Sequence, residues 1–364
     1  MKITIDKFKR IDFAEVNLDK VNIFIGANNS GKSSFIQGVQ FAVSSCQTLS
    51  LKGVHWRKKH TQTLGLDSSD FLYSPTRFIE DLHNGSKLVG ARRKEDRKKL
   101  LFTFSKDDDI AYISVSRSKN GGFDTTVEGR PLGVILGSID RPFCVYVPGL
   151  AGVPIEERYA PPITIKKSAI RGDSNNFLRN ILLSISQNTD SMASFIHSVN
   201  LLYPGISIAA SYDEHRTEFI QVNVTISGHQ MPLDSVGTGL LQVIQAFAYI
   251  EYFNPQLLLL DEPDAHIHPT KQKLLAHELL RKANESADLR IVFSTHSRYI
   301  LDALEDKARV FHFEHGKAIP DVQGSKILLD IGAADADYLF SKKNLKYVIA
   351  TEDKVDGVDD KKAY

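Results

Sequence analysis

The chain has 364 residues, of which 42% are hydrophobic and 24% are charged, a balance that excludes a disordered chain and can bury a real core. Its net charge of +1 excludes a global attraction to nucleic acid or membrane, so any DNA contact would depend on local basic patches. Cys46 and Cys144 are the only cysteines and have no metal-ligand spacing. With no apolar run of membrane-spanning length, we expect a soluble protein of the reducing cytoplasm with no membrane partner.

The first part of the chain is predicted to form strands around a glycine-rich turn. Residues 2–8 alternate apolar and polar side chains, and residues 21–25 are a short apolar run that ends at Gly26. Helical spacing of apolar residues follows over 33–44, and residues 50–100 are polar, basic and irregular. Further strands are expected at 100–104, 110–116 and 143–147.

The second part alternates strands and helices after a helical segment. Apolar residues at helical spacing predict a short insertion at 173–204, which lacks the sustained heptads of a long coiled coil. Strands are then expected at 206–211, 219–227, 257–260 and 291–294, and helices at 240–252 and 270–283. This order predicts an α/β fold with a mostly parallel sheet, an antiparallel β subdomain and a short helical insertion.

The glycine-rich turn carries a complete phosphate-binding motif. Residues 26–33, Gly-Ala-Asn-Asn-Ser-Gly-Lys-Ser, match G-x-x-x-x-G-K-[ST] between a predicted strand and a predicted helix, which favours a P-loop over a chance glycine turn. Its backbone N–H groups would bind phosphates, Lys32 would neutralise their charge, and Ser33 would bind Mg²⁺. The sequence therefore predicts ATP and Mg²⁺ as ligands. The expected nucleotide-binding residues are Gly26, Asn28, Asn29, Ser30, Gly31, Lys32, Ser33 and Ser34.

A second motif follows the apolar run at 257–260. Asp261 at the end of this strand is expected to bind the metal, and Glu262 to act as general base toward the attacking water. The alternative is a structural acidic turn. The next residues include Asp264, His266 and His268, whose spacing indicates a loop that contacts a partner subunit rather than a zinc pair.

A histidine ends the strand predicted at 291–294. His296 follows this strand at the distance expected from the Asp261–Glu262 motif, so we interpret it as a catalytic sensor that donates a hydrogen bond to the γ-phosphate. A histidine with only a structural role is the alternative.

Together these motifs resemble the ABC-type ATPases, a group shared with SMC proteins. Residues 233–239, Leu-Asp-Ser-Val-Gly-Thr-Gly, look like a degenerate signature motif, with Ser235 and Gly237 at the serine and second-glycine positions. The resemblance implies that these two residues, with Asp264 nearby, reach the nucleotide of the opposite subunit in a homodimer or higher oligomer. The alternative for 233–239 is a plain helix cap. The group also has a glutamine after the antiparallel subdomain; none stands at 146–157, where Glu156, Glu157 or water could substitute.

The whole chain most resembles the overcoming-lysogenization-defect (OLD) ATPases of phage-defence systems. The opening strand–hairpin–strand with its Gly-x-Asn-x-Ser-Gly-Lys-Ser, and residues 146–157, carry this likeness. It implies control of a nuclease, supplied by an effector subunit or a fused Toprim domain. The alternatives are a DNA-repair ATPase that clamps DNA and a slowly hydrolysing scaffold that holds an effector.

The resemblance divides the chain into four parts. We expect an ATPase domain at 1–172 and 205–344, interrupted by the helical insertion at 173–204. Residues 345–364 would begin a Toprim-like domain with Glu352 after its first strand, or else form a final edge strand with a polar tail. Because one such strand cannot supply a nuclease site, we expect no nuclease activity from this chain alone.

Two basic stretches could contact DNA. They are residues 55–60, which include Trp56, and residues 92–99. The alternative for both is an ordinary solvated surface.

Overall fold

A computed structural model describes residues 1–58, 60–90, 97–119, 121–149 and 152–320. At its centre lies a six-stranded sheet of order β15-β14-β3-β13-β12-β8, in which all neighbours are parallel except β15 and β14. The strands are β3 (Val21–Ile25), β8 (Cys144–Val147), β12 (Leu257–Asp261), β13 (Arg290–Ser294), β14 (Arg309–Glu314) and β15 (Lys317–Pro320). The continuous apolar runs of β3 and β12 suit parallel strands that are buried on both faces. The predicted mostly parallel sheet is confirmed.

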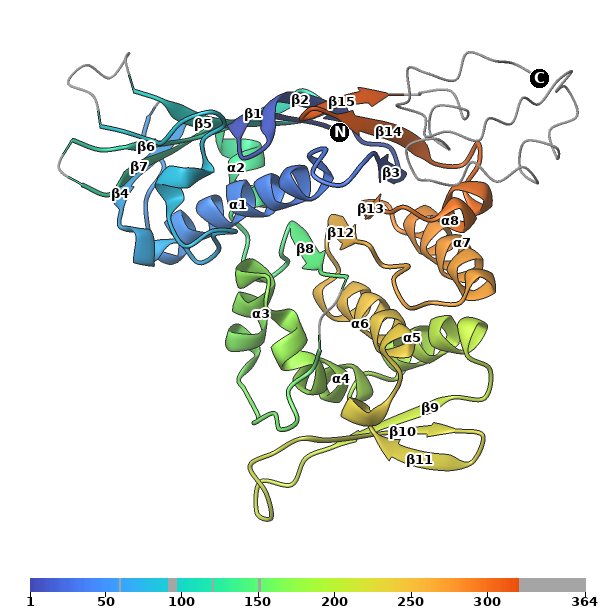
Figure 1. Cartoon of the computed structure of the whole chain (residues 1–364). Coiled ribbons are helices and arrows are strands. Elements are labelled where there is room, and N and C mark those ends of the chain that lie inside the picture. Colours follow the sequence, from blue (N-terminus) through green and yellow to red (C-terminus); the bar gives the residue numbers. More distant parts are fainter. Residues whose placement is uncertain (59, 91–96, 120, 150–151, 321–364) are drawn as a thin grey trace, which may run out of the picture.

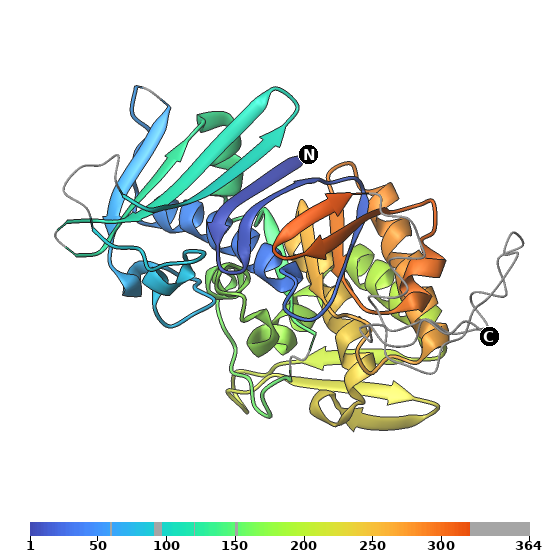
Figure 2. The same ribbon diagram turned by 45° about the horizontal axis from the view of Figure 1, so that its top comes forward.

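A second six-stranded sheet is antiparallel and has the order β2-β1-β5-β6-β7-β4 (Figures 1 and 2). Its strands are β1 (Lys2–Phe8), β2 (Ile11–Asn17), β4 (Thr61–Leu66), β5 (Lys99–Lys106), β6 (Asp109–Arg117) and β7 (Phe123–Glu128). They alternate buried and exposed residues, as expected for a sheet with one packed face. The predicted antiparallel subdomain is therefore present, with β2, β4 and β7 added to the strands expected from the sequence.

The long helix α1 (Lys32–Leu51) joins the two sheets. It contacts β1 and β5 of the antiparallel sheet and β8 and β12 of the parallel sheet, and it is buried along most of its length. The short helix α2 (Arg130–Leu136) packs beside it. One hydrophobic core thus connects α1 with both sheets and holds the start of α1 at the end of β3.

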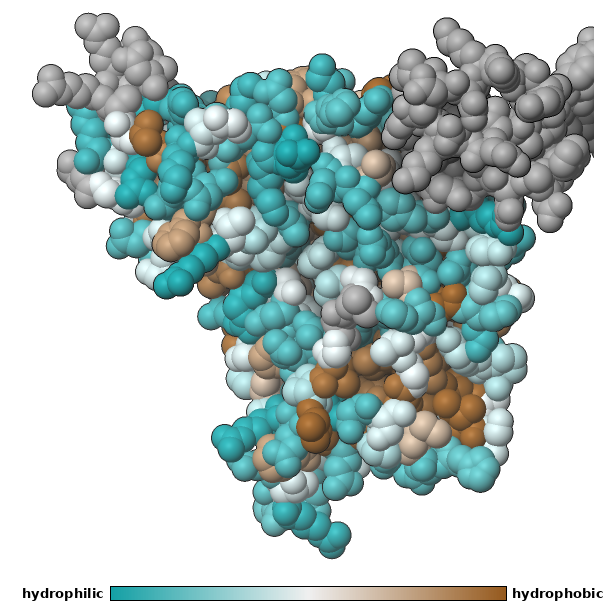
Figure 3. All heavy atoms as spheres, in the orientation of Figure 1, coloured by the Kyte–Doolittle hydropathy of each residue, from teal (hydrophilic) through white to brown (hydrophobic). Residues whose placement is uncertain are grey.

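Below the parallel sheet lies a mainly helical body (Figure 1). It contains α3 (Pro162–Arg171), α4 (Leu178–Ser186), α5 (Thr189–Leu202) and α6 (Thr238–Phe253), and a small antiparallel sheet of β9 (Ser207–Ser211), β10 (Gln221–Ile226) and β11 (His229–Pro232). Apolar residues gather over α5 and α6 on the face in Figure 3, whereas the surface above them is mainly polar. The helices α4 and α5 fall within 173–204, but they pack on α6 as one body, and α3 begins before that range.

Two further helices, α7 (Pro269–Glu285) and α8 (Arg298–Ala303), lie beside β13, and 3₁₀ turns occupy Ser68–Asp70, Ile79–Leu82, Ser174–Phe177 and Leu233–Ser235. None of the helices in the described part of the chain has both the length and the apolarity needed to cross a membrane. The predicted strand before Glu352, the rest of 345–364, and most of the basic stretch 92–99 lie outside the described residues.

Candidate functional site

The P-loop runs from the end of β3 to the start of α1, as the sequence predicts. Gly26 and Gly31 have φ angles of 139° and 121°, and Asn29 has a φ of 62°, so the loop uses the left-handed region that glycine tolerates. A Cβ atom at Gly26 would lie 2.2 Å from the backbone oxygen of Phe313 on β14. The close approach of β14 therefore requires glycine at position 26.

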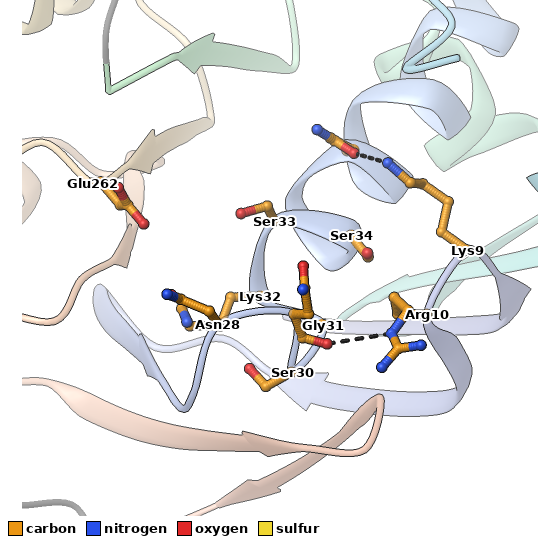
Figure 4. A pocket seen from close by; sticks show the side chains of 11 residues that line it. Lys9, Arg10, Asn28, Ser30, Gly31, Lys32, Ser33, Ser34 and Glu262 are labelled. Atoms are coloured by element: carbon orange, nitrogen blue, oxygen red, sulfur yellow. Dashed lines mark hydrogen bonds between the residues drawn. The ribbon is translucent and has the colours of Figure 1, made fainter. Parts of the chain in front are cut away.

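A polar cavity of about 560 Å³ opens over the P-loop (Figure 4). This volume lies within the range of small-molecule sites. Its lining combines most of the predicted nucleotide-binding residues with three groups from elsewhere: Lys9 and Arg10 at the turn between β1 and β2, Gln37 of α1, and Glu262 after β12. The P-loop part of the lining is Asn28, Asn29, Ser30, Gly31, Lys32, Ser33 and Ser34.

The Lys32 side chain is buried and fully engaged. Its ammonium group donates to the backbone oxygens of Gly26 at 2.6 Å and of Ala27 at 3.2 Å. The third contact is with Nε2 of His296 at 3.1 Å. Burial lowers the pKa of Lys32 from its ordinary value, although the nearby carboxylates of Glu262 and Asp261 oppose this shift. The site thus holds a cation at the P-loop that phosphate oxygens could reach by replacing these acceptors.

The Asp261 carboxylate is held by two hydroxyl groups. Ser33 Oγ donates to Oδ1 at 3.2 Å, and the Tyr146 hydroxyl donates to Oδ2 at 3.3 Å. A hydroxyl and a carboxylate beside a phosphate-sized cavity fit Mg²⁺, which usually takes one or two protein ligands and fills its shell with phosphate oxygens and water. Burial, with the Asp261 charge, raises the pKa of Tyr146 well above its ordinary value, so this phenol remains a hydrogen-bond donor.

Glu262 faces the cavity from the side opposite Lys9 and Arg10 (Figure 4). Its φ angle of 52° is unusual for a residue other than glycine, and its N–H donates to the backbone oxygen of Ser294 at 2.7 Å. Such backbone strain persists only where the surrounding structure imposes it, and it concentrates at functional sites. The β12–β13 pairing therefore holds this carboxylate in an orientation that a relaxed turn would not adopt.

His296 follows β13 and meets Lys32 in the same site. Burial is the main cause that lowers the pKa of His296 from its ordinary value, and the Lys32 charge lowers it further. The imidazole is therefore neutral near pH 7, with Nε2 free to accept from the ammonium group.

Residues 21–302 match the family described as "AAA domain, putative AbiEii toxin, Type IV TA system". The chain belongs to this family. It is thus a nucleotide-binding domain of the P-loop ATPase type, as the motifs predict. No curated protein matches the chain.

Two solved structures share the fold of this AAA domain. The SmcHead bound to the C-winged helix domain of ScpA has a TM-score of 0.56 and 16% identity, covering 90% of this chain and 98% of that one. The Smc head domain with an extended coiled coil, bound to the C-terminal domain of ScpA from Pyrococcus furiosus, has a TM-score of 0.51 and 14% identity, covering 91% and 98%. At these identities the likeness shows the fold alone, and the predicted ABC/SMC-like fold is confirmed.

Four predicted nucleotide-binding residues of the AAA domain lie outside its own cavity lining: Gly26, which begins the P-loop, and three residues from elsewhere in the chain. Ser235 and Gly237 are exposed just before α6. Asp264 turns inward, where Oδ1 accepts from the Thr295 hydroxyl at 2.6 Å, and burial raises its pKa. A Cβ atom at Gly239 would lie 2.6 Å from the backbone oxygen of His266, so the start of α6 packs on the loop that contains Asp264.

Two alternatives from the sequence find no support at this site. The Nδ1 atom of His268 accepts from the backbone N–H of Thr270 and caps α7. No group of three or more His, Cys, Asp or Glu side chains is placed to hold a metal within the described ranges, so His266 and His268 belong to no zinc cluster there. The suggestion that Glu157 completes the metal shell is wrong, because this buried carboxylate accepts from the backbone N–H groups of Arg179 and Asn180 at the start of α4. Glu156 lines a separate groove beside Asp234.

Four residues of the site could not be predicted from the sequence motifs: Lys9, Arg10, Gln37 and Tyr146. Lys9 Nζ donates to Gln37 Oε1 at 2.6 Å, and Arg10 Nε donates to the backbone oxygen of Asn29 at 3.3 Å, so both cations reach the cavity from the β1–β2 turn. The only signal in the sequence was the Lys-Arg pair between two strands.

The first basic stretch shows one contact that bears on DNA binding. Trp56 is half-buried against α2, where a Cβ atom at Gly133 would lie 2.4 Å from its ring. Its ring is therefore committed at least in part to packing. DNA contact through 55–60 and 92–99 stays a prediction.

Proposed function

We propose that this AAA domain binds ATP with Mg²⁺ in the P-loop cavity and hydrolyses it. The observation that carries the proposal is that three separate segments of the chain meet at one cavity: Lys32, Ser33 and Glu262 line it, Asp261 contacts Ser33, and His296 contacts Lys32. The backbone of residues 26–34 and Lys32 would bind the phosphates. Ser33 and Asp261 would hold Mg²⁺, which supplies neutralisation of phosphate charge when bound.

In the proposed reaction Glu262 is the general base. Its carboxylate would take a proton from water while the water oxygen bonds to the γ-phosphorus, and the bond to the β–γ bridging oxygen breaks with its electrons leaving on ADP. His296 would lose its contact with Lys32 and donate to a γ-phosphate oxygen through its protonated ring nitrogen. Lys9 and Arg10 would place two further positive charges near the phosphates.

The complete site would form between two subunits. Ser235 and Gly237 lie exposed at the start of a 16-residue helix and line no part of the cavity of their own chain. We propose that this surface covers the nucleotide of a second copy, so that a head-to-tail dimer contains two sites. Asp264 would support the same interface indirectly, since it ties the loop beside α6 to Thr295.

A turnover assay with Glu262→Gln tests the catalytic proposal. The variant should bind ATP like the wild type, hydrolyse it about 10²–10⁴ times more slowly, and accumulate as an ATP-bound dimer in light scattering. Glu305→Gln, on the surface after α8, is the control and should keep full activity. Hydrolysis by Glu262→Gln at the wild-type rate would contradict the role of general base.

We further propose that the ATP state of the dimer controls a nuclease effector in anti-phage defence, as in the OLD ATPases. The family description, which names a putative AbiEii toxin and a type IV toxin–antitoxin system, supports a toxic or defensive output. Purified chain with Mg²⁺ or Mn²⁺ should leave plasmid and linear DNA intact, and addition of the effector should produce ATP-dependent cleavage. Cleavage by the chain alone that survives repurification would contradict this assignment of the nuclease to another component.

A further inference from the structure

Tyr146 links β8 to the carboxylate at the end of β12. The two strands pair in parallel, with Tyr146 opposite Leu259, so the tyrosine lies two residues before the level of Asp261. Its hydroxyl nevertheless reaches forward along the sheet edge and donates to Asp261 Oδ2 at 3.3 Å. The other oxygen, Oδ1, accepts from Ser33 at 3.2 Å.

We propose that Tyr146 is a positioning residue that orients the Asp261 carboxylate for a divalent cation. The inference rests on the proposed function, since it assumes that Asp261 and Ser33 form the metal site. It adds a residue that touches neither nucleotide nor metal and acts only through Asp261.

A carboxylate needs such a partner because its terminal torsion is broad and two-fold. One hydroxyl on Oδ1 leaves the group free to rotate about the bond to Cβ, whereas hydroxyls on both oxygens fix its plane. Both contacts, at 3.2 and 3.3 Å, are longer than the usual hydroxyl hydrogen bond, so they orient the carboxylate without holding it tightly. Partners of this kind, which orient a ligand rather than bind the metal, typically contribute about 10–100-fold to metal affinity.

The Tyr146 ring is held in place by its surroundings. The β8–β12 pairing fixes its backbone, and the ring lies beside the C-terminus of α3, where a Cβ atom at Gly172 would be 3.8 Å from it and 3.3 Å from Tyr73. A phenol also has few rotamers, so little freedom is lost when its hydroxyl is fixed. The donor is therefore preorganised before any ligand binds.

The next residues of the chain explain why a side chain on β8 takes this role. After β8 the backbone turns beneath the Asp261–Glu262 peptide, and a Cβ atom at Gly149 would lie 2.6 Å from the backbone oxygen of Asp261. The helix α6 secures this turn, because Gln242 donates to the backbone oxygen of Gly149. The backbone after β8 therefore lies against the backbone of Asp261. Among the described residues of β8 and this turn, Tyr146 is the one whose side chain bonds to the Asp261 carboxylate.

The test is Mn²⁺ binding to protein loaded with ADP, followed by electron paramagnetic resonance, with Tyr146→Phe compared against the wild type. The variant keeps the ring and removes only the hydroxyl, and we expect its Kd for Mn²⁺ to rise about 10-fold or more. ADP affinity measured in EDTA should stay within about two-fold of the wild type, which a general loss of structure would not allow. Tyr73→Phe is the matched control, since Tyr73 is the neighbouring phenol and makes no hydrogen bond with Asp261; its Kd should not change.

Equal Mn²⁺ affinity of Tyr146→Phe and the wild type would overturn the inference, as would an equal loss in Tyr73→Phe. The outcome is separable from that of the proposed function. If the wild type binds ADP and Mn²⁺ but does not hydrolyse ATP, the proposed activity fails while the role of Tyr146 is still decided by the two affinities. If the wild type binds no Mn²⁺ at all, both fail.

Discussion

The Nζ atom of Lys32 lies 3.1 Å from Nε2 of His296, and this contact completes the hydrogen bonding of the P-loop lysine. An ammonium group has three N–H donors, and the other two acceptors are the backbone oxygens of Gly26 and Ala27. The main cation of the site is therefore bound by the site's own acceptors. Phosphate oxygens would replace at least one of these acceptors, and a released His296 can donate to the phosphate through its protonated ring nitrogen.

The first prediction concerns the protonation of His296. Because burial and the Lys32 charge lower its pKa, its NMR titration midpoint should fall below the ordinary value of about 6.5. The folded protein therefore binds a proton at His296 less readily than the unfolded chain does. The free energy of unfolding should decrease as the pH falls below about 6.5, the ordinary pKa of histidine in the unfolded chain. In Lys32→Met the midpoint should rise, yet stay below 6.5 because burial remains. A midpoint that does not move in Lys32→Met would contradict the contact.

The second prediction is that Lys32→Ala abolishes measurable ATP binding. The phosphates lose a charge-assisted donor whose side chain is buried, and we expect affinity to fall by about 100-fold or more. Titration of a fluorescent ATP analogue measures this loss. Lys2→Ala removes an exposed lysine that pairs with Glu15, and it should bind like the wild type. Unchanged affinity in Lys32→Ala would refute the P-loop assignment.

The local parts of the site could be predicted from the sequence because each motif is contiguous. Residues 26–33 and 261–262 need only their own order and the flanking apolar runs, and β3 has the expected bounds of Val21–Ile25. Tyr146 could not be predicted, since its partner Asp261 is 115 positions away and only the β8–β12 pairing brings them together. Glu157 shows the opposite case, because a suggestive carboxylate proves to cap a helix.

The fold was predictable at the level of its sheets and less so in its short elements. Strands β4 and β7 are short and rich in threonine, and β4 pairs only with β7, at the edge of the sheet beyond β6 in the described part of the chain. Helix α3 was not predicted from the sequence; it begins at Pro162, a first helical position that proline favours. The nucleotide motifs are shared by many P-loop ATPases and do not by themselves distinguish the OLD ATPases. The family match rests on the AAA domain over residues 21–302 and does not test the OLD resemblance.

The third prediction tests whether sites form between subunits. Ser235→Arg and Lys32→Ala chains should each be inactive alone, because one lacks a usable signature surface and the other lacks phosphate binding. A heterodimer of the two contains one site with both defects and one with neither. Mixing equal amounts of the two variants should therefore restore ATP hydrolysis, at a rate of up to one active site per heterodimer. Heterodimers that form, as shown by mass spectrometry, and yet stay inactive would contradict action in trans.

The last prediction concerns the attachment to the helical body of residues 233–239, the proposed signature segment. Arg179 of α4 donates to Asp234 Oδ1 at 2.8 Å and to the backbone oxygen of Pro154 at 2.5 Å, and its side chain is only 4% exposed. Arg179→Met would leave a partly buried carbonyl without its donor and a carboxylate without its cation. Removing one partner of a buried pair typically costs about 3–5 kcal/mol, but Asp234 is 30% exposed and can be hydrated, so we expect a loss of about 2–3 kcal/mol in the free energy of unfolding by urea.

Arg158→Met is the matched control for this experiment. Arg158 pairs with Glu218 in the same body, but the two side chains are 71% and 58% exposed, and such pairs contribute less than about 1 kcal/mol. Because Asp234 directly precedes Ser235, Arg179→Met should also weaken ATP-dependent dimerisation in light scattering, whereas Arg158→Met should not. If both variants lose the same stability, the Arg179–Asp234 pair is not what holds the signature segment, and its exposed position before α6 must depend on the packing of Leu233 and Val236 instead.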